Sequence, residues 1–82
     1  MTESKPAAGT VLASIPKRPG EEYRLSIEDF RGTMRVNIRV WWQDDMGDWR
    51  PSKMGLSMTP AHFRDVWGAL HKADAALKDL GL

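Results

Sequence analysis

Residues 30–59 have the sequence FRGTMRVNIRVWWQDDMGDWRPSKMGLSMT, and this stretch decides the fold. From Thr33 to Trp41 apolar and polar residues alternate, which is the period of a β-strand with two different faces. The apolar face carries Met34, Val36, Ile38 and Val40, and the other face carries Thr33, Arg35, Asn37, Arg39 and Trp41. Turn residues on both sides of the run predict antiparallel neighbours.

The second face combines positive charge with large rings. Further cations and rings surround it: Arg31, Arg50 and Lys53, and Phe30, Trp41, Trp42 and Trp49. Rings interleaved with cations suit a nucleic-acid strand, because bases stack on the rings and the cations neutralise phosphates. The alternative is a set of core aromatic residues with arginines on the exposed face of a sheet, and spacing alone leaves both interpretations open.

The chain of 82 residues has room for one domain. Residues 1–20 are polar and rich in proline and glycine, which predicts a flexible N-terminal tail and linker before a domain over residues 21–82. A domain of about 60 residues buries only about 60% of its chain's surface. The chain has no cysteine, so neither a disulfide nor a thiolate metal site can reinforce it. We therefore expect oligomerisation.

Net charge and hydropathy limit the partners. The formal net charge is +1, so binding of nucleic acid must depend on the local distribution of charge. No apolar run approaches the roughly 20 residues of a membrane span, and the patch Val11–Ile15 is too short for a secretory signal. We expect a soluble, cytoplasmic protein without a membrane partner.

Strand and turn signals follow one another along the chain before Thr59. Val11–Ile15 could form an edge strand, but Pro16 stops the patch and we favour a linker. Tyr23–Ile27 is the first predicted strand, and Gly32 supplies the turn into the second, Thr33–Trp42.

Two shorter strands are expected after the long one. Trp49 and Arg50 begin a third strand, in which Pro51 indicates an edge, a bulge or an early stop. Ser52–Gly55 is a second predicted turn, and Leu56–Met58 is a short fourth strand.

A helix of about 20 residues, about 30 Å long, completes the fold. Thr59 is a predicted N-cap, Pro60 is suited to the first helical position, and Gly81 is placed to end the helix. Its apolar residues are spaced alternately by three and four: Phe63, Val66, Trp67, Leu70, Ala73, Leu77 and Leu80. This spacing resembles a coiled-coil seam, and we expect part of it to pack on the same helix of a second subunit.

Catalytic and metal-binding constellations are not recognised in the sequence. His62 and His71 are nine residues apart, on opposite sides of the predicted helix, and Ser57 has no histidine or acid at a motif spacing. The turn at Asp44 is acidic, which raises a calcium alternative, but Met46 breaks the spacing of a calcium loop. We expect no enzyme activity, no catalytic residue, no cofactor, no metal and no small-molecule substrate.

The motifs FRG, VNIRVWW and DWRPSKMGLSMTP, with the aromatic Phe63 behind them, resemble the C-terminal domain of the transcriptional coactivator positive cofactor 4 in its small bacterial form. The resemblance covers about residues 15–80. It implies an α+β fold with a four-stranded curved antiparallel sheet followed by one C-terminal helix (ββββα). It also implies a homodimer whose grooves bind single-stranded DNA with little sequence preference.

The resemblance also implies site residues. Phe30 and Trp42 match rings on which bases stack, and the matches to phosphate-binding positions are Arg31, Arg39, Arg50 and Lys53. Secondary candidates from the pattern are Arg35, Trp41 and Trp49. Trp42 falls on the apolar side of an unbroken alternation, so either a bulge re-aims it or Trp41 does the stacking. Thr33 and Met54 stand where the family often has a basic residue, which predicts a flatter salt dependence of binding.

Three functions fit these features. The first is a homodimeric, nucleoid-associated protein that binds single-stranded DNA, coactivator-like, and acts on melted DNA in transcription, repair or replication. The second is an interaction module that docks an acidic partner of the transcription machinery. The third is a small structural dimer whose aromatic residues are all core.

Overall fold

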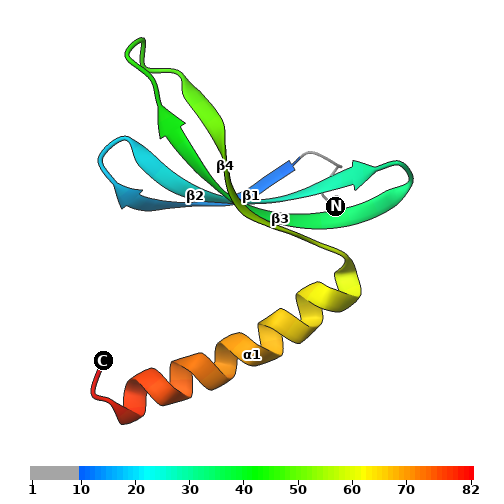
Figure 1. Ribbon diagram of the computed structural model, residues 1–82, viewed down its shortest axis with the longest axis vertical. Coiled ribbons are helices and arrows are strands. Elements are labelled where there is room, and N and C mark those ends of the chain that lie inside the picture. The colour runs from blue at the N-terminus through cyan, green and yellow to red at the C-terminus, as the bar shows by residue number, and fades with distance from the viewer. Residues whose placement is uncertain (1–9) are drawn as a thin grey trace, which may run out of the picture.

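The computed structural model describes residues 10–82. They form strands β1 (Thr10–Arg18), β2 (Glu21–Phe30), β3 (Thr33–Gln43) and β4 (Trp49–Met58), followed by helix α1 (Pro60–Asp79). The strands make one antiparallel sheet in the order β1-β2-β3-β4, and the helix extends along one side of it (Figure 1). The prediction of four antiparallel strands and a C-terminal helix is confirmed. Of the tail and linker predicted for residues 1–20, residues 1–9 lie outside the described residues.

Strand β1 occupies the segment for which we favoured a linker, and that prediction is wrong. Ala13 pairs with Leu25 and Ile15 pairs with Tyr23, so the short apolar patch continues the sheet beyond β2. Pro16 does not end the strand, because β1 is an edge strand and an edge tolerates a residue without an N–H group. The folded part of the chain therefore already includes Thr10–Arg18.

The third and fourth predicted strands are a single strand, β4. The predicted turn between them is an irregularity in pairing: Arg39 lies opposite Gly55 and Trp41 lies opposite Pro51, so residues 52–54 all face Val40. The Ser52 hydroxyl donates to the Val40 carbonyl at 2.7 Å and accepts from the Met54 N–H at 3.1 Å. The serine thus replaces backbone bonds that the bulge removes, and the strand continues.

Helix α1 begins as predicted and leaves its apolar side largely uncovered. Thr59 Oγ1 accepts a hydrogen bond from the His62 N–H at 3.3 Å, and Pro60 occupies the first helical turn. Phe63 and Val66 are half-buried, whereas the rest of the helix is exposed, including Trp67 at 57%. In residues 10–82, no helix combines the length and the hydropathy needed to cross a membrane.

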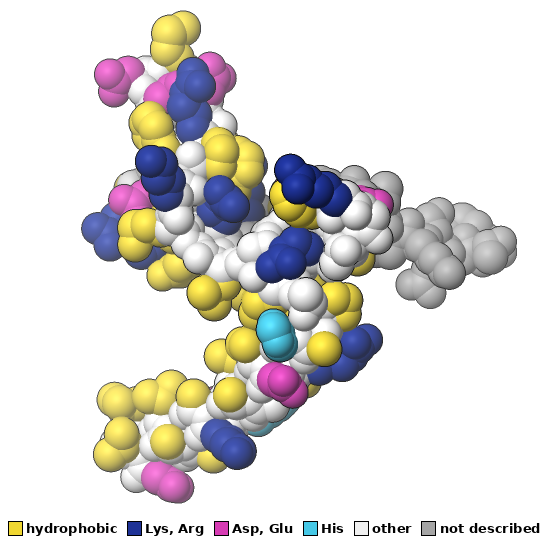
Figure 2. Space-filling model, turned by 45° about the vertical axis from the view of Figure 1, so that its right-hand side comes forward, with side chains coloured by type: hydrophobic (Ala, Val, Ile, Leu, Met, Phe, Trp, Pro, Cys, Tyr) yellow, Lys and Arg dark blue, Asp and Glu magenta, His cyan; other side chains and the backbone are white. Residues whose placement is uncertain are grey.

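The core of the isolated chain is small. Within residues 10–82, the buried hydrophobic residues are Val40 and Met58. Leu56 on the sheet is 58% exposed and Leu70 on the helix is 54% exposed. Figure 2 shows Lys and Arg side chains gathered over the sheet and hydrophobic side chains along the helix. The single chain therefore exposes apolar surface on both the sheet and α1.

Candidate nucleic-acid interface

The register of β2, β3 and β4 builds one polar face of the sheet. The β2–β3 ladder is regular, and residues opposite each other in antiparallel strands project from the same face. The pairs on this face are Arg24–Arg39, Ser26–Asn37, Glu28–Arg35 and Phe30–Thr33, in which Phe30 is the one apolar residue. In β4, Ser57 lies beside Asn37 and extends this face. The opposite face carries the apolar pairs, such as Leu25–Ile38, and is named the apolar face below.

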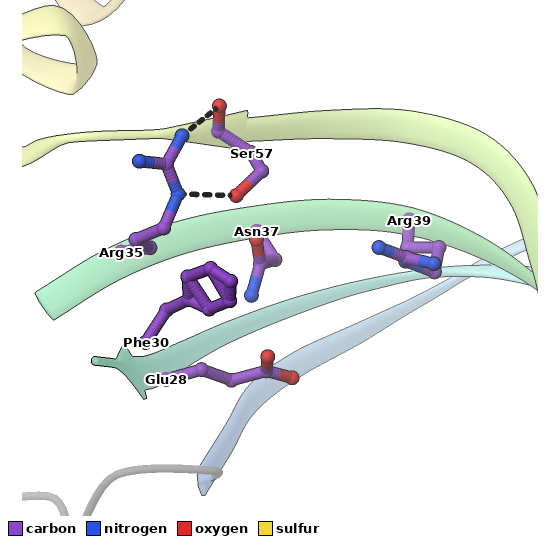
Figure 3. A pocket seen from close by; sticks show the side chains of 6 residues that line it. All are labelled: Glu28, Phe30, Arg35, Asn37, Arg39 and Ser57. Carbon is purple, nitrogen blue, oxygen red and sulfur yellow. Dashed lines mark hydrogen bonds between the residues drawn. The ribbon is translucent and has the colours of Figure 1, made fainter. Parts of the chain in front are cut away.

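Two adjoining hollows follow the polar face. The first has a volume of about 320 Å³ and is lined by Glu28, Phe30, Arg35, Asn37, Arg39 and Ser57 (Figure 3). The second has a volume of about 300 Å³ and is lined by Ser26, Glu28, Asn37, Arg39, Trp41 and Pro51. Three residues line both hollows: Glu28, Asn37 and Arg39. The hollows therefore form one polar groove, with Phe30 in one half and Trp41 in the other.

Two arginines bring positive charge into the polar groove. Arg35 donates from Nε to Ser57 Oγ at 2.8 Å and from Nη2 to the Ser57 carbonyl at 3.0 Å. Arg39 donates from Nη1 to the Ser52 carbonyl at 3.2 Å. Among residues 10–82, neither arginine forms a salt bridge, so their charges are held in place by neutral β4 groups without being neutralised.

The β2–β3 turn fixes the Phe30 end of the groove. Arg31 and Gly32 have φ angles of 54° and 82°, and Asp29 Oδ1 accepts a hydrogen bond from the Gly32 N–H at 2.8 Å. The Arg31 guanidinium lies 5.1 Å from the centre of the Phe30 ring, which is 52% exposed. A ring and a cation are therefore presented together at this end.

Sequence reasoning missed Arg24, which organises the other end of the groove. Its guanidinium lies 4.2 Å from the centre of the Trp41 ring and 5.5 Å from that of Trp49, and its Nε donates to Glu22 at 2.6 Å. Arg24 therefore covers part of two candidate stacking rings, while Glu22 compensates its charge. The feature that identifies Arg24 is its position opposite Arg39, and this position can be recognised only once the β2–β3 register is known.

The comparison with known families agrees with this architecture. Residues 17–69, more than half of the chain, match the family model described as Transcriptional Coactivator p15 (PC4). The chain belongs to the PC4 family. This membership confirms the resemblance drawn from the sequence motifs.

Solved PC4 homologues have similar structures. The crystal structure of BPSL1147, a PC4 homolog from Burkholderia pseudomallei K96243, superposes with a TM-score of 0.74 at 28% identity, covering 87% of this chain and 96% of that chain. A bacteriophage T5 homolog of the eukaryotic transcription coactivator PC4, implicated in recombination-dependent DNA replication, gives a TM-score of 0.59 at 26% identity. Its match covers 85% of this chain and 96% of that chain.

The structure separates the two rings between which the PC4 resemblance left a choice. Trp41 projects into the polar groove, whereas Trp42 pairs with Glu21 and Arg50 on the apolar face and is 43% exposed. The bulge lies in β4 and leaves the β2–β3 ladder regular, so it does not turn the Trp42 side chain to the face that carries Trp41.

The remaining candidate cations of the PC4 site lie away from the groove. Lys53 is exposed in the irregular part of β4, and Arg50 lies near the β3–β4 turn. The groove thus unites Phe30, Arg35, Arg39 and Trp41, with Arg31 at its edge. The roles of all these residues in binding stay predictions.

The Asp44 carboxylate, in the acidic β3–β4 turn, forms hydrogen bonds with neighbouring residues of the same chain. Asp44 Oδ1 accepts from the N–H groups of Met46 at 2.9 Å and Asp48 at 3.0 Å, and Oδ2 accepts from Arg50 Nε at 2.6 Å. The hydrogen bond from Arg50, followed by those from the backbone, lowers the pKa of Asp44. Within residues 10–82, no group of three or more His, Cys, Asp or Glu side chains is placed to hold a metal ion.

Proposed function

We propose that this PC4-family protein binds single-stranded DNA in the polar groove and acts on melted DNA in transcription, repair or replication. The observation that carries the proposal is the groove itself, which combines Phe30 and Trp41 with Arg35 and Arg39, two arginines that form no salt bridge within residues 10–82. The relatives support a role on DNA, since one is implicated in recombination-dependent DNA replication. Under this proposal the protein is nucleoid-associated, and contact with the transcription machinery is a secondary role.

The mechanism is capture of unpaired bases. An unpaired base can place its flat face on Phe30 or Trp41, and each such stack contributes about 1–3 kcal/mol. Arg35 and Arg39 neutralise phosphates of the same strand and release counterions. In an intact duplex the bases already stack on one another, so the rings add little and only the charges contribute. The groove therefore favours single strands and melted regions over duplex DNA.

Paired alanine substitutions test which rings bind. We expect Trp41→Ala to weaken binding of a 20-base single strand by about tenfold, the equivalent of one base stack. Trp42→Ala, on the apolar face, should change the affinity by less than about twofold. Fluorescence anisotropy with a labelled strand measures both variants, and circular dichroism verifies that each is folded. A folded Trp41→Ala protein with unchanged affinity contradicts the assignment; a large loss in Trp42→Ala alone moves the site to the other face.

We further propose that the functional unit is a homodimer joined through α1. The exposed stripe of the helix, including Trp67, Leu70 and Leu77, and the exposed apolar side chains of the sheet support this arrangement. A chain of this size has too little core to leave such surface in water, and a second copy supplies an equal apolar surface.

The oligomeric state tests the dimer. Sedimentation equilibrium should give twice the mass of the chain for the wild type. Leu70→Glu should shift the protein toward monomer because it places a charge in the apolar stripe, whereas Lys72→Glu, on the opposite side of the helix, should remain dimeric. A monomeric wild type at micromolar concentration contradicts the proposal.

A further inference from the structure

Asn37 is a buried polar residue at the floor of the first hollow. It is 6% exposed, and within residues 10–82 its amide makes no hydrogen bond. The amide atoms are not sealed from solvent, however, because no unsatisfied side-chain atom in this part of the chain is fully buried. Figure 3 shows the amide nitrogen pointing from β3 towards the Phe30 and Glu28 side of the hollow. An amide left without a partner in this position is available to a ligand.

Glu28 is a second unpaired group in the same hollow. Its cross-strand neighbour is Arg35, but Arg35 turns to β4 and donates both of its hydrogen bonds to Ser57. Within residues 10–82, the Glu28 carboxylate makes no hydrogen bond or ion pair. A free carboxylate in a groove for DNA repels phosphates, so its favourable contacts are with hydrogen-bond donors of the bases.

The two groups lie beside a stacking ring. Asn37 and Glu28 line the same hollow of about 320 Å³ as Phe30 (Figure 3), so a base stacked on Phe30 can direct its edge towards them. The guanine edge has one acceptor, O6, followed by two donors, N1–H and N2–H₂. The Asn37 amide can donate to O6, and the two carboxylate oxygens of Glu28 can accept from the two donors.

The other bases match this pair less well. Thymine has a single N–H between two carbonyl oxygens, and one of those oxygens would face the carboxylate. Adenine and cytosine each have one amino donor next to an acceptor nitrogen, so the carboxylate gains one hydrogen bond at most. We propose that Glu28 and Asn37 form a base-reading pair that favours guanine over thymine in the hollow beside Phe30. The inference rests on the proposed function, because it concerns the same groove, and it departs from the low sequence preference that the family resemblance implies.

Three 20-base strands test the pair: alternating thymine–guanine, alternating thymine–inosine and all-thymine. Measurements in a lithium buffer prevent guanine quadruplexes. We expect the wild type to bind the guanine strand about tenfold more tightly than the thymine strand, the discrimination typical of one bidentate base contact. Inosine lacks the N2 amino group and should lose most of this preference.

A matched pair of variants identifies the carboxylate. Glu28→Gln keeps the size of the side chain but removes its charge and one acceptor, so it should bind the thymine strand more tightly and lose the preference for guanine. Asp65→Asn removes a carboxylate from α1, outside the groove, and should keep the wild-type preference. Equal wild-type affinity for the guanine and thymine strands, or a preference that persists in Glu28→Gln, overturns the inference while leaving the groove intact. Absence of binding to all three strands overturns the proposed function as well.

Discussion

At Gly55, β4 lies close against the β3 backbone, and replacement of this glycine by alanine should be strongly destabilising. Its φ is 156°, and a Cβ there would overlap the Ile38 carbonyl oxygen and lie 2.8 Å from Arg39 Cα. Both atoms belong to the β3 backbone, so rotation of a side chain cannot relieve the contact. Overpacking costs about 1–3 kcal/mol and an unfavourable φ costs about 1–3 kcal/mol. We expect Gly55→Ala to lower the free energy of unfolding by about 2–6 kcal/mol.

Urea denaturation followed by tryptophan fluorescence measures this loss. Gly68→Ala is the matched control, because a Cβ at this helical position has no neighbour within 4 Å. Alanine is favoured over glycine inside a helix, so the control should be more stable by about 0.5–1 kcal/mol. A Gly55→Ala protein within about 0.5 kcal/mol of the wild type refutes the close pairing of Gly55 with Arg39, and with it the position of Arg39 in the groove.

Other changes probe α1 and the β3–β4 turn. Thr59→Ala removes the acceptor for the His62 N–H and should lower the free energy of unfolding by about 1 kcal/mol in urea, while an unchanged midpoint contradicts the cap. The pKa of Asp44 is lowered from 3.8, so its carboxylate adds stability above that pH and loses it as the pH falls through the lower folded value. As the pH falls below about 5, the wild type should therefore lose more stability than Asp44→Asn, and parallel curves of unfolding free energy against pH contradict the Arg50 contact. If Arg50 binds phosphate, Asp44→Asn should also steepen the salt dependence of DNA binding by up to about 0.7 in log–log slope, and an unchanged slope removes Arg50 from the site.

The alternation of residues 33–41 predicted the long central strand and its two faces, because burial of one face imposes a period of two. The errors lie at the edges of the sheet. The patch that became β1 is short and contains Pro16, and its pairing with β2 depends on backbone hydrogen bonds that composition does not encode. In β4, Ser52 and Gly55 have turn chemistry, but the serine stabilises a bulge within a continuous strand.

The site was partly predictable for the same reason. Arg35, Arg39 and Trp41 share a face of one strand, so their proximity follows from the sequence, and Phe30 follows from the hairpin turn. The stack of Arg24 on Trp41 depends on the register between β2 and β3, and so does the presence of Glu28 and Asn37 in one hollow. A shift of one residue would place these side chains on opposite faces, and the sequence pattern alone does not fix that register.

The central claim is tested most directly by comparing single-stranded and duplex DNA. Anisotropy of a labelled oligonucleotide of about 20 bases, in both forms, should be measured across a series of salt concentrations. The account predicts that the single strand binds at least about tenfold more tightly, with a log–log slope of about 0.7 for each phosphate neutralised. Equal binding to both forms would contradict a stacking groove and favour an acidic protein partner for Arg35 and Arg39. Absence of binding to either form would contradict the proposed function.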